Sequence, residues 1–266
     1  MLSSAPPGSS SLIMAKVRSH LAHAPITEAL IDFRVVPSGG LELTRVRRLA
    51  DDLNDIYEAQ GQLLEMQAQL SIAPPGGPQS EPKTFTRERG IRLRSRKDPS
   101  FILQIRPNGF TMSRLEPYQN WEHLLRETKS LWQRYADVTK ASQVTRIATR
   151  FINNLKLPMQ DGQGFEAYLT KPPDVPPEMP QGVLGFMQRI VIVDPVHDVK
   201  ANIIQLLQEG VAAPDHVPII LDIDVYKTVR MSIDDPTIWE SMTRLRVFKN
   251  EIFFASLTEP AVELFA

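Results

Sequence analysis

Two carboxylates two positions apart are the first residues of this chain with an obvious chemical use. Asp222 and Asp224 lie in the run Leu221-Asp222-Ile223-Asp224, where apolar and acidic residues alternate. Because successive side chains of a β-strand point to opposite faces, a strand here places both carboxylates on one face. Paired carboxylates bind a divalent cation or divide acid and base roles. No further ligands accompany them in the sequence, so we expect no metal site and favour ion pairs with arginine across a sheet.

Two other expected strands carry polar side chains on one face. The first contains Glu28, Asp32 and Arg34, which share that face with Leu30, and the second contains Arg146, Arg150 and Asn154. These faces form either a buried ion network or the wall of a ligand groove. The expected contacts in such a groove are Arg150, Asn154, Asp222 and Asp224.

The strongest local charge bias lies in residues 83–114, which hold nine Lys or Arg and two acidic residues. At its centre is a row of alternating arginines, Arg92, Arg94 and Arg96. On a strand these guanidinium groups share a face, where they bind phosphates or carboxylates. Aromatic residues, which typically accompany arginine in single-stranded nucleic-acid binding, are sparse here. Pairing with acids on a neighbouring strand, such as Glu65 or Glu88, is therefore the favoured interpretation.

The elements that must position these residues are expected to occur twice along the chain, because Trp121 and Trp239 each open a helical pattern and lie 118 positions apart. Phe33 and Phe151 end the apolar part of two strands at the same offset. The first set of expected elements comprises strands at 26–36, 63–72, 91–96, 101–106 and 110–115 and helices at 44–57 and 121–138. The second set comprises strands at 144–157, 183–193, 199–207 and 218–225, helices at 165–169 and 237–247, and a strand or helical extension at 252–257.

This order predicts an α+β fold of two tandem pseudo-repeats, each a curved antiparallel sheet packed on a long closing helix. The expected divisions are a flexible N-terminal tail at 1–21, a first half at 22–140 and a second half at 141–266. The tail is rich in Ser, Pro and Gly, and the sequence leaves open whether translation starts at Met1 or Met14. Residues 74–82 have the composition of a loop.

Composition restricts the classes of function further. The 266 residues carry a formal net charge of −1, so the chain as a whole is not a polycation. It contains no cysteine, which excludes disulfides and thiolate chemistry and fits a cytoplasmic location. No apolar run reaches about 18 residues, so we expect no membrane association through a transmembrane helix. Phosphate-binding glycine motifs and zinc-binding histidine motifs are missing as well, so no cofactor and no metal are expected.

Four short motifs together resemble those of a protein family. They are Ala24-Pro25-Ile26-Thr27-Glu28-Ala29, Arg150-Phe151-Ile152-Asn153, Leu221-Asp222-Ile223-Asp224 and Arg246-Val247-Phe248-Lys249-Asn250-Glu251-Ile252-Phe253. The family is bacterial, sporadically distributed and of about this length. The resemblance implies no reaction, and the patchy distribution is associated with mobile or defence-related gene neighbourhoods.

The leading hypothesis from sequence is a non-enzymatic cytoplasmic binding protein that engages a macromolecular partner, with another protein expected ahead of nucleic acid. A first alternative is a small-molecule or nucleotide-binding sensor or enzyme whose site lies between the two halves. A second alternative is nucleic-acid binding through Arg92, Arg94 and Arg96. A deep pocket between the halves with convergent polar groups would favour the first alternative.

Overall fold

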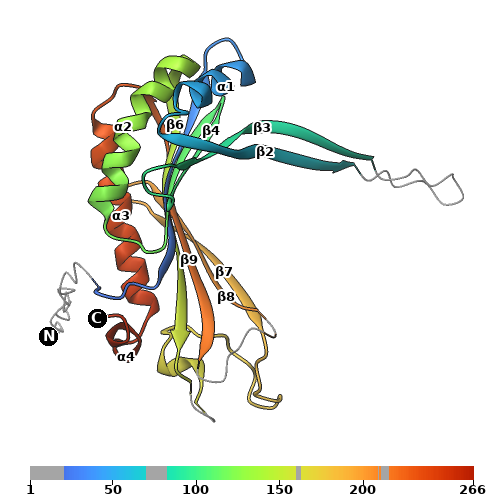
Figure 1. The fold of residues 1–266 in the computed structure, drawn as a ribbon. Helices are drawn as coiled ribbons and strands as arrows, with labels where there is room; N and C mark the ends of the chain where they lie inside the picture. The colour runs from blue at the N-terminus through green and yellow to red at the C-terminus, as the bar shows by residue number, and fades with distance from the viewer. Residues whose placement is uncertain (1–20, 70–82, 160–162, 209, 211–215) are drawn as a thin grey trace, which may run out of the picture.

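The computed structural model describes residues 21–69, 83–159, 163–208, 210 and 216–266. Within these residues, nine strands form one antiparallel sheet in the order β2-β3-β4-β5-β1-β6-β9-β8-β7 (Figure 1). The strands are β1 (Ile26–Pro37), β2 (Tyr57–Gln69), β3 (Lys83–Ser95), β4 (Phe101–Arg106), β5 (Gly109–Leu115), β6 (Ala141–Leu157), β7 (Phe186–Asp194), β8 (Val199–Leu207) and β9 (Val217–Ser232). The helices are α1 (Leu43–Asp52), α2 (Trp121–Thr139), α3 (Thr237–Ser256) and α4 (Glu259–Glu263), with a 3-10 turn, η1, at Phe165–Ala167.

The two expected halves meet at the centre of the sheet. Strand β1, the first of the N-terminal half, pairs antiparallel with β6, the first of the C-terminal half, from Ile26 opposite Asn153 to Pro37 opposite Ala141. The last strands, β5 and β9, flank this central pair. The expected α+β fold with an antiparallel sheet is thus present. Two separate sheets were expected from the sequence, but the structure has a single sheet, because the first strands of the two halves, β1 and β6, pair with each other.

Alternation along the central strands separates two faces of the sheet. On β1, Ala29, Ile31 and Phe33 are fully buried, and they point toward the face along which α2 and α3 lie one after the other (Figure 1). We call the opposite side the open face. The ring of Phe33 lies 4.3 Å from that of Trp132 in α2 and 5.8 Å from that of Trp239 in α3. One hydrophobic core therefore runs under both long helices.

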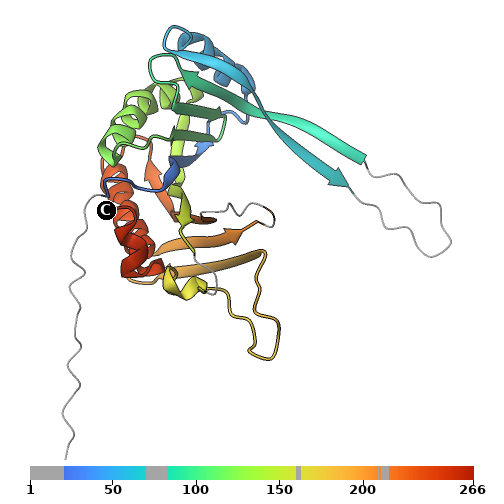
Figure 2. The ribbon, with the colours of Figure 1, turned by 60° about the horizontal axis from the view of Figure 1, so that its bottom comes forward.

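A long hairpin of β2 and β3 leaves the body of the sheet (Figures 1 and 2). The two strands pair along their whole length, from Tyr57 opposite Ser95 to Gln69 opposite Lys83, whereas β3 pairs with β4 only over Ile91–Arg94. Gly90 stands where the hairpin departs. A Cβ atom there would lie 2.1 Å from the carbonyl oxygen of Ile105, so this backbone approach requires glycine.

Several element boundaries differ from those expected from the sequence. The helix expected at 44–57 ends at Asp52, because the chain turns into β2 at Tyr57, whose buried ring joins the core. Gly61 lies within β2 at a φ of 143°. The closing helix expected at 237–247 continues to Ser256, so the helical extension, not the strand, is correct for most of 252–257. The helix expected at 165–169 is a single 3-10 turn.

Other expectations are confirmed or fall outside the described chain. The strand expected at 199–207 is confirmed, and β9 continues beyond Val225, where the expected strand ended, to Ser232. The expected tail, apart from Leu21, lies outside the described residues. The expected loop at 74–82 also lies outside them, and the described chain resumes at Lys83. Among the described helices, none combines the length and the apolar composition needed to cross a bilayer.

Candidate functional site

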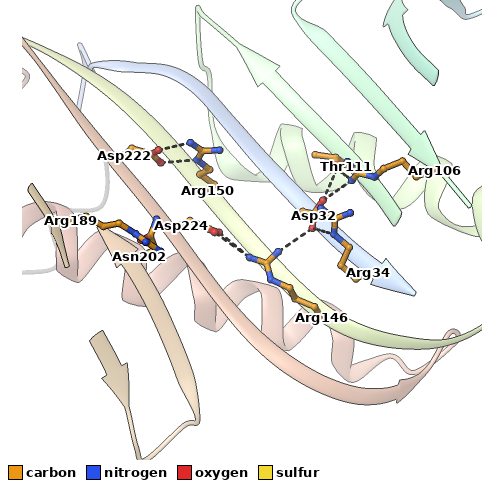
Figure 3. Close-up of polar contacts among 10 residues, drawn as sticks. All are labelled: Asp32, Arg34, Arg106, Thr111, Arg146, Arg150, Arg189, Asn202, Asp222 and Asp224. Carbon is orange, nitrogen blue, oxygen red and sulfur yellow. Dashed lines mark hydrogen bonds and ion pairs between the residues drawn. The ribbon is translucent and has the colours of Figure 1, made fainter. Parts of the chain in front are cut away.

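The polar residues expected on the central strands do come together, on the open face (Figure 3). Asp32 of β1 is the centre of this group and is almost completely buried. Its carboxylate lies 3.2 Å from Arg34, 3.0 Å from Arg106 and 3.1 Å from Arg146. The hydroxyl of Thr111 donates a further hydrogen bond of 2.6 Å. Three arginines therefore share one carboxylate.

The same group extends across β6 to β9. Arg146 lies 3.2 Å from Asp224, and Arg150 donates two hydrogen bonds, of 2.8 and 2.5 Å, to the two oxygens of Asp222. Burial raises the pKa of Asp224, although Arg146 acts in the opposite direction. The hydrogen bond to Asp222 raises the pKa of Arg150. The expected arginine–aspartate network across the sheet is confirmed.

The aspartates of this network are already engaged by arginines. The oxygens of Asp222 face a bidentate guanidinium, which is a geometry that leaves little room for a metal ion. Within the described residues, no three His, Asp or Glu side chains gather as metal ligands would. Glu28 lies on the same face, opposite Ile152. Asn154 belongs to the end of β6, and its Oδ1 is buried with no hydrogen-bond partner in the described chain.

The arginine row does not form as expected. Arg92 and Arg94 lie on the open face of β3, opposite Gln104 and Ile102, and neither has an ion pair in the part of the chain described. Arg96 follows the end of the strand, where its Nε donates to the carbonyl oxygen of Asn54 at 2.8 Å. Glu65 and Glu88, the acids expected to pair with this arginine row, contact other arginines: Glu65 contacts Arg89, and Glu88 contacts Arg47.

A second polar group lies on the helix-covered face and was not expected. It lines a groove of about 1200 Å³ between the start of α2, the second half of α3 and the lower ends of β1 and β6. Both halves of the chain contribute to it. Its walls include six aromatic side chains, those of Tyr118, Trp121, Phe151, Phe253, Phe254 and Phe265. Its polar side chains include two cations from α3, Arg246 and Lys249, and the amides of Asn153 and Asn250.

Lys249 occupies an unusual position in this groove. Only 6% of the residue is exposed, and its Nζ lies 3.9 Å from the ring centre of Phe151 and 5.9 Å from that of Phe253. The ammonium has neither a hydrogen bond nor an ion pair with any described residue. Burial, and secondarily the charge of Arg246, lowers the pKa of Lys249 to about 7.

Arg246 stands one helical turn before Lys249 and is only loosely neutralised. Its nearest carboxylate, Glu122 at the start of α2, is 3.6 Å away and largely exposed. Its guanidinium also lies 5.9 Å from the ring centre of Trp121. The indole Nε1 of Trp121 is buried with no hydrogen-bond partner among the described residues. The groove thus presents two cations from α3, together with the carboxylates of Glu116 and Glu122 and the exposed amine of Lys156.

Local structure explains how these side chains are held. Asn120 caps α2, its Oδ1 accepting a 2.8 Å hydrogen bond from the backbone N–H of His123, and this fixes Trp121 in the first turn. On α3, Arg246, Lys249, Asn250 and Phe253 follow the helical spacing of three and four residues and therefore share one face. Below them, the N–H of His23 donates to the carbonyl oxygen of Phe265 at 3.1 Å.

The signal for this groove was present in the sequence. The four residues Arg246, Lys249, Asn250 and Phe253 belong to one of the motifs that carry the family resemblance, and all four line the groove. The closing helix expected at 237–247 includes Arg246 but ends before Lys249, Asn250 and Phe253, so the sequence does not place these three on the same helical face. Of the expected site residues, Asn154 alone lines the groove.

Comparisons with protein-family models and with curated proteins give no match for this chain.

Proposed function

We propose that the protein binds a small molecule that carries an anionic group, in the groove between its two halves. The observation that carries the proposal is the pair of cations on α3, one of them buried without any acidic partner in the described chain. An isolated ammonium in an apolar environment is costly, and that cost favours the arrival of an anion. This proposal corresponds to the first alternative from the sequence, a small-molecule site between the two halves. Of the residues expected there, only Asn154 lines the groove.

The groove divides into parts that suit different parts of such a ligand. The guanidinium of Arg246 suits a carboxylate or phosphate, because its planar donors match two oxygens at once. The aromatic walls suit an apolar or planar body, and amides such as that of Asn250 suit its polar edges. A volume of about 1200 Å³ exceeds what a simple inorganic ion fills.

We also infer that the two halves are tandem copies. The inference is supported by the order of elements, because each half begins with a central strand and ends with a long helix on the same face. Superposing residues 141–266 on residues 22–140 should place α3 on α2, and a superposition that separates them would contradict the inference. A cytoplasmic location and a macromolecular partner stay predictions from the sequence.

Isothermal titration calorimetry of the full chain tests the proposed binding function. The probes are benzoate, phenyl phosphate and AMP, with benzamide as an uncharged analogue of benzoate. We expect at least one anion to bind, and benzamide to bind at least tenfold more weakly than benzoate. Because charge-assisted hydrogen bonds contribute about 1.5–3 kcal/mol, Arg246→Gln should weaken anion binding by roughly tenfold or more.

Arg244→Gln is the matched control, since Arg244 belongs to the same helix but is exposed and pairs with Glu240. It should bind the anions as the unmodified protein does. Equal affinity of Arg246→Gln and Arg244→Gln for the anions would overturn the assignment of the groove. Failure of every probe to bind at millimolar concentration would also count against the proposal.

A further inference from the structure

We propose that Lys249 forms an imine with an aldehyde or ketone that carries an anionic group, which makes the groove a covalent carbonyl-binding site. The proposal rests on the proposed function for the anionic group, which Arg246 holds, and goes beyond it in assigning a reaction to Lys249. The chemical class of ligand is therefore an oxo acid or an oxo phosphate with an apolar or planar body.

The geometry sets Lys249 apart from an ordinary lysine. Its Nζ lines an accessible groove, yet the residue is 94% removed from solvent and packs against Phe151 and Phe253. Among the described residues, no carboxylate pairs with it and no carbonyl accepts a hydrogen bond from it. Lys227, by contrast, donates a 2.6 Å hydrogen bond to the carbonyl oxygen of His197. An amine that is not engaged elsewhere is free to approach a bound carbonyl carbon.

The surroundings of Lys249 also favour the neutral amine, which is the nucleophile. Desolvation in an apolar pocket and a neighbouring cation are the two ways in which proteins activate lysine for carbonyl chemistry, and Lys249 has both. With a pKa of about 7, roughly half of Lys249 is neutral at pH 7. A lysine at the ordinary pKa of about 10.4 is neutral in only about one molecule in 2,500.

The reaction conserves atoms and needs no oxidant or reductant. The lone pair of the neutral Nζ attacks the carbonyl carbon, and the carbonyl π electrons move to the oxygen. A proton passes from nitrogen to that oxygen to give a carbinolamine. The C–O bond then breaks as the nitrogen lone pair forms the C=N bond, and water leaves with both hydrogens of the former amine.

Other titratable groups face the groove and bear on its pH dependence. Arg246 comes from α3, Glu122 from α2, Glu116 and Tyr118 from the segment before α2, Lys156 from β6 and His23 from the segment before β1. Burial raises the pKa of Tyr118, so its phenol stays neutral in the pH range of interest. Lys156 is exposed.

Reductive trapping tests the proposal on the full chain. The protein is treated at pH 7 with 4-carboxybenzaldehyde and sodium cyanoborohydride, and modified residues are located by peptide mass spectrometry. We expect Lys249 to be the principal site of modification, at least a hundredfold faster than exposed lysines such as Lys200, with the rate rising through a midpoint near pH 7. Benzaldehyde, which lacks the anion, should label Lys249 at least tenfold more slowly.

Two variants separate the reaction from the binding. Lys249→Arg keeps a cation but has no nucleophilic amine, so it should bind 4-methylbenzoate and form no adduct in the groove; Lys249→Met is the substitute if the larger side chain prevents folding. Arg246→Gln should slow labelling by 4-carboxybenzaldehyde more than labelling by benzaldehyde, because loss of the guanidinium removes the contact with the anion and also weakens the lowering of the pKa of Lys249, which affects both aldehydes. If 4-methylbenzoate binds and Lys249 is labelled no faster than Lys200, the imine is overturned while the proposed binding function stands. If Lys249 is labelled no faster than Lys200 and neither 4-methylbenzoate nor benzoate, phenyl phosphate or AMP binds, both the imine and the proposed binding function are overturned.

Discussion

At the scale of single residues, Lys249 and Asp32 show two different ways of keeping a charge inside this protein. Asp32 is surrounded by three arginines and a hydroxyl, so its negative charge is fully compensated. Lys249 has only the faces of aromatic rings, which attract a cation but do not neutralise it. The ion pairs of Asp32 join neighbouring strands of the sheet. The ammonium of Lys249 is left without an anionic partner in the described chain, and an anionic ligand would supply one.

Replacing Lys249 by methionine should stabilise the ligand-free protein in a way that depends on pH. The pKa of Lys249 is lower in the folded state, about 7, than in the unfolded state, about 10.5. The cost of burying the charge is therefore fully present below pH 7, and it disappears as the pH rises from 7 through 10.5. We expect Lys249→Met to gain on the order of 2–3 kcal/mol at pH 6, after the loss of the contact with Phe151, and little at pH 10.

Urea unfolding at pH 6, 8 and 10 measures this difference. Lys200→Met is the control, because Lys200 is exposed and its effect on the free energy of unfolding should not change over this range. A stability difference between Lys249→Met and the unmodified protein that stays constant from pH 6 to pH 10 would show that the ammonium is not desolvated.

At the scale of elements, the hairpin of β2 and β3 is held to the body of the molecule by a short contact. Only Ile91–Arg94 of β3 pairs with β4, and the rest of the hairpin has no other strand beside it in the described chain. The crossing is close at Gly90, where the backbone of β3 passes the carbonyl of Ile105. The close approach of the hairpin to the carbonyl of Ile105 therefore depends on one residue without a side chain.

Gly90→Ala should disturb this contact. The added methyl group would lie 2.1 Å from the oxygen of Ile105 and 2.8 Å from Cγ of Arg106, and the backbone must move to accommodate it. We expect a loss of about 1–3 kcal/mol in urea unfolding, with reduced hydrogen-exchange protection over Ile91–Arg94. Gly182→Ala is the control, since a Cβ there meets nothing within 4 Å. Equal stability and equal protection in the two variants would contradict the close approach.

At the scale of the whole molecule, the two halves share one sheet and one core. The pairing of β1 with β6 joins their backbones, and Phe33 in the first half contacts the ring of Trp239 in the second. The groove also takes its walls from both halves, with Trp121 from the first and Lys249 from the second. A ligand site of this kind forms only when both halves are folded and joined.

Unfolding should therefore be a single transition. Far-UV circular dichroism and tryptophan fluorescence should give the same urea midpoint, and Phe33→Ala should lower both together by an amount equivalent to about 3–5 kcal/mol. Val36→Ala on the same strand is the control, because Val36 is 44% exposed and should cost far less. Two separate transitions, with only one of them sensitive to Phe33→Ala, would mean that the halves fold independently.

The sequence by itself determined most of the strands, the two long helices and the side chains that share each face. Local pattern is enough for this, because alternation and the helical period are set by backbone geometry. The arginine–aspartate pairs across β6 and β9 followed from the same alternation, as Arg150 opposite Asp222 shows. The pattern could not give the extent of α3, because residues 252–257 fit either a helix or a strand.

Only the tertiary structure decided that the two halves form one sheet and that a groove lies between them. The pairing of β1 with β6 joins residues more than a hundred positions apart, and no local pattern specifies it. The same pairing brings Phe151 under α3, where Lys249 meets it and is removed from water. The chemistry of that lysine arises from burial, which is a property of the packed molecule and not of any segment of its sequence.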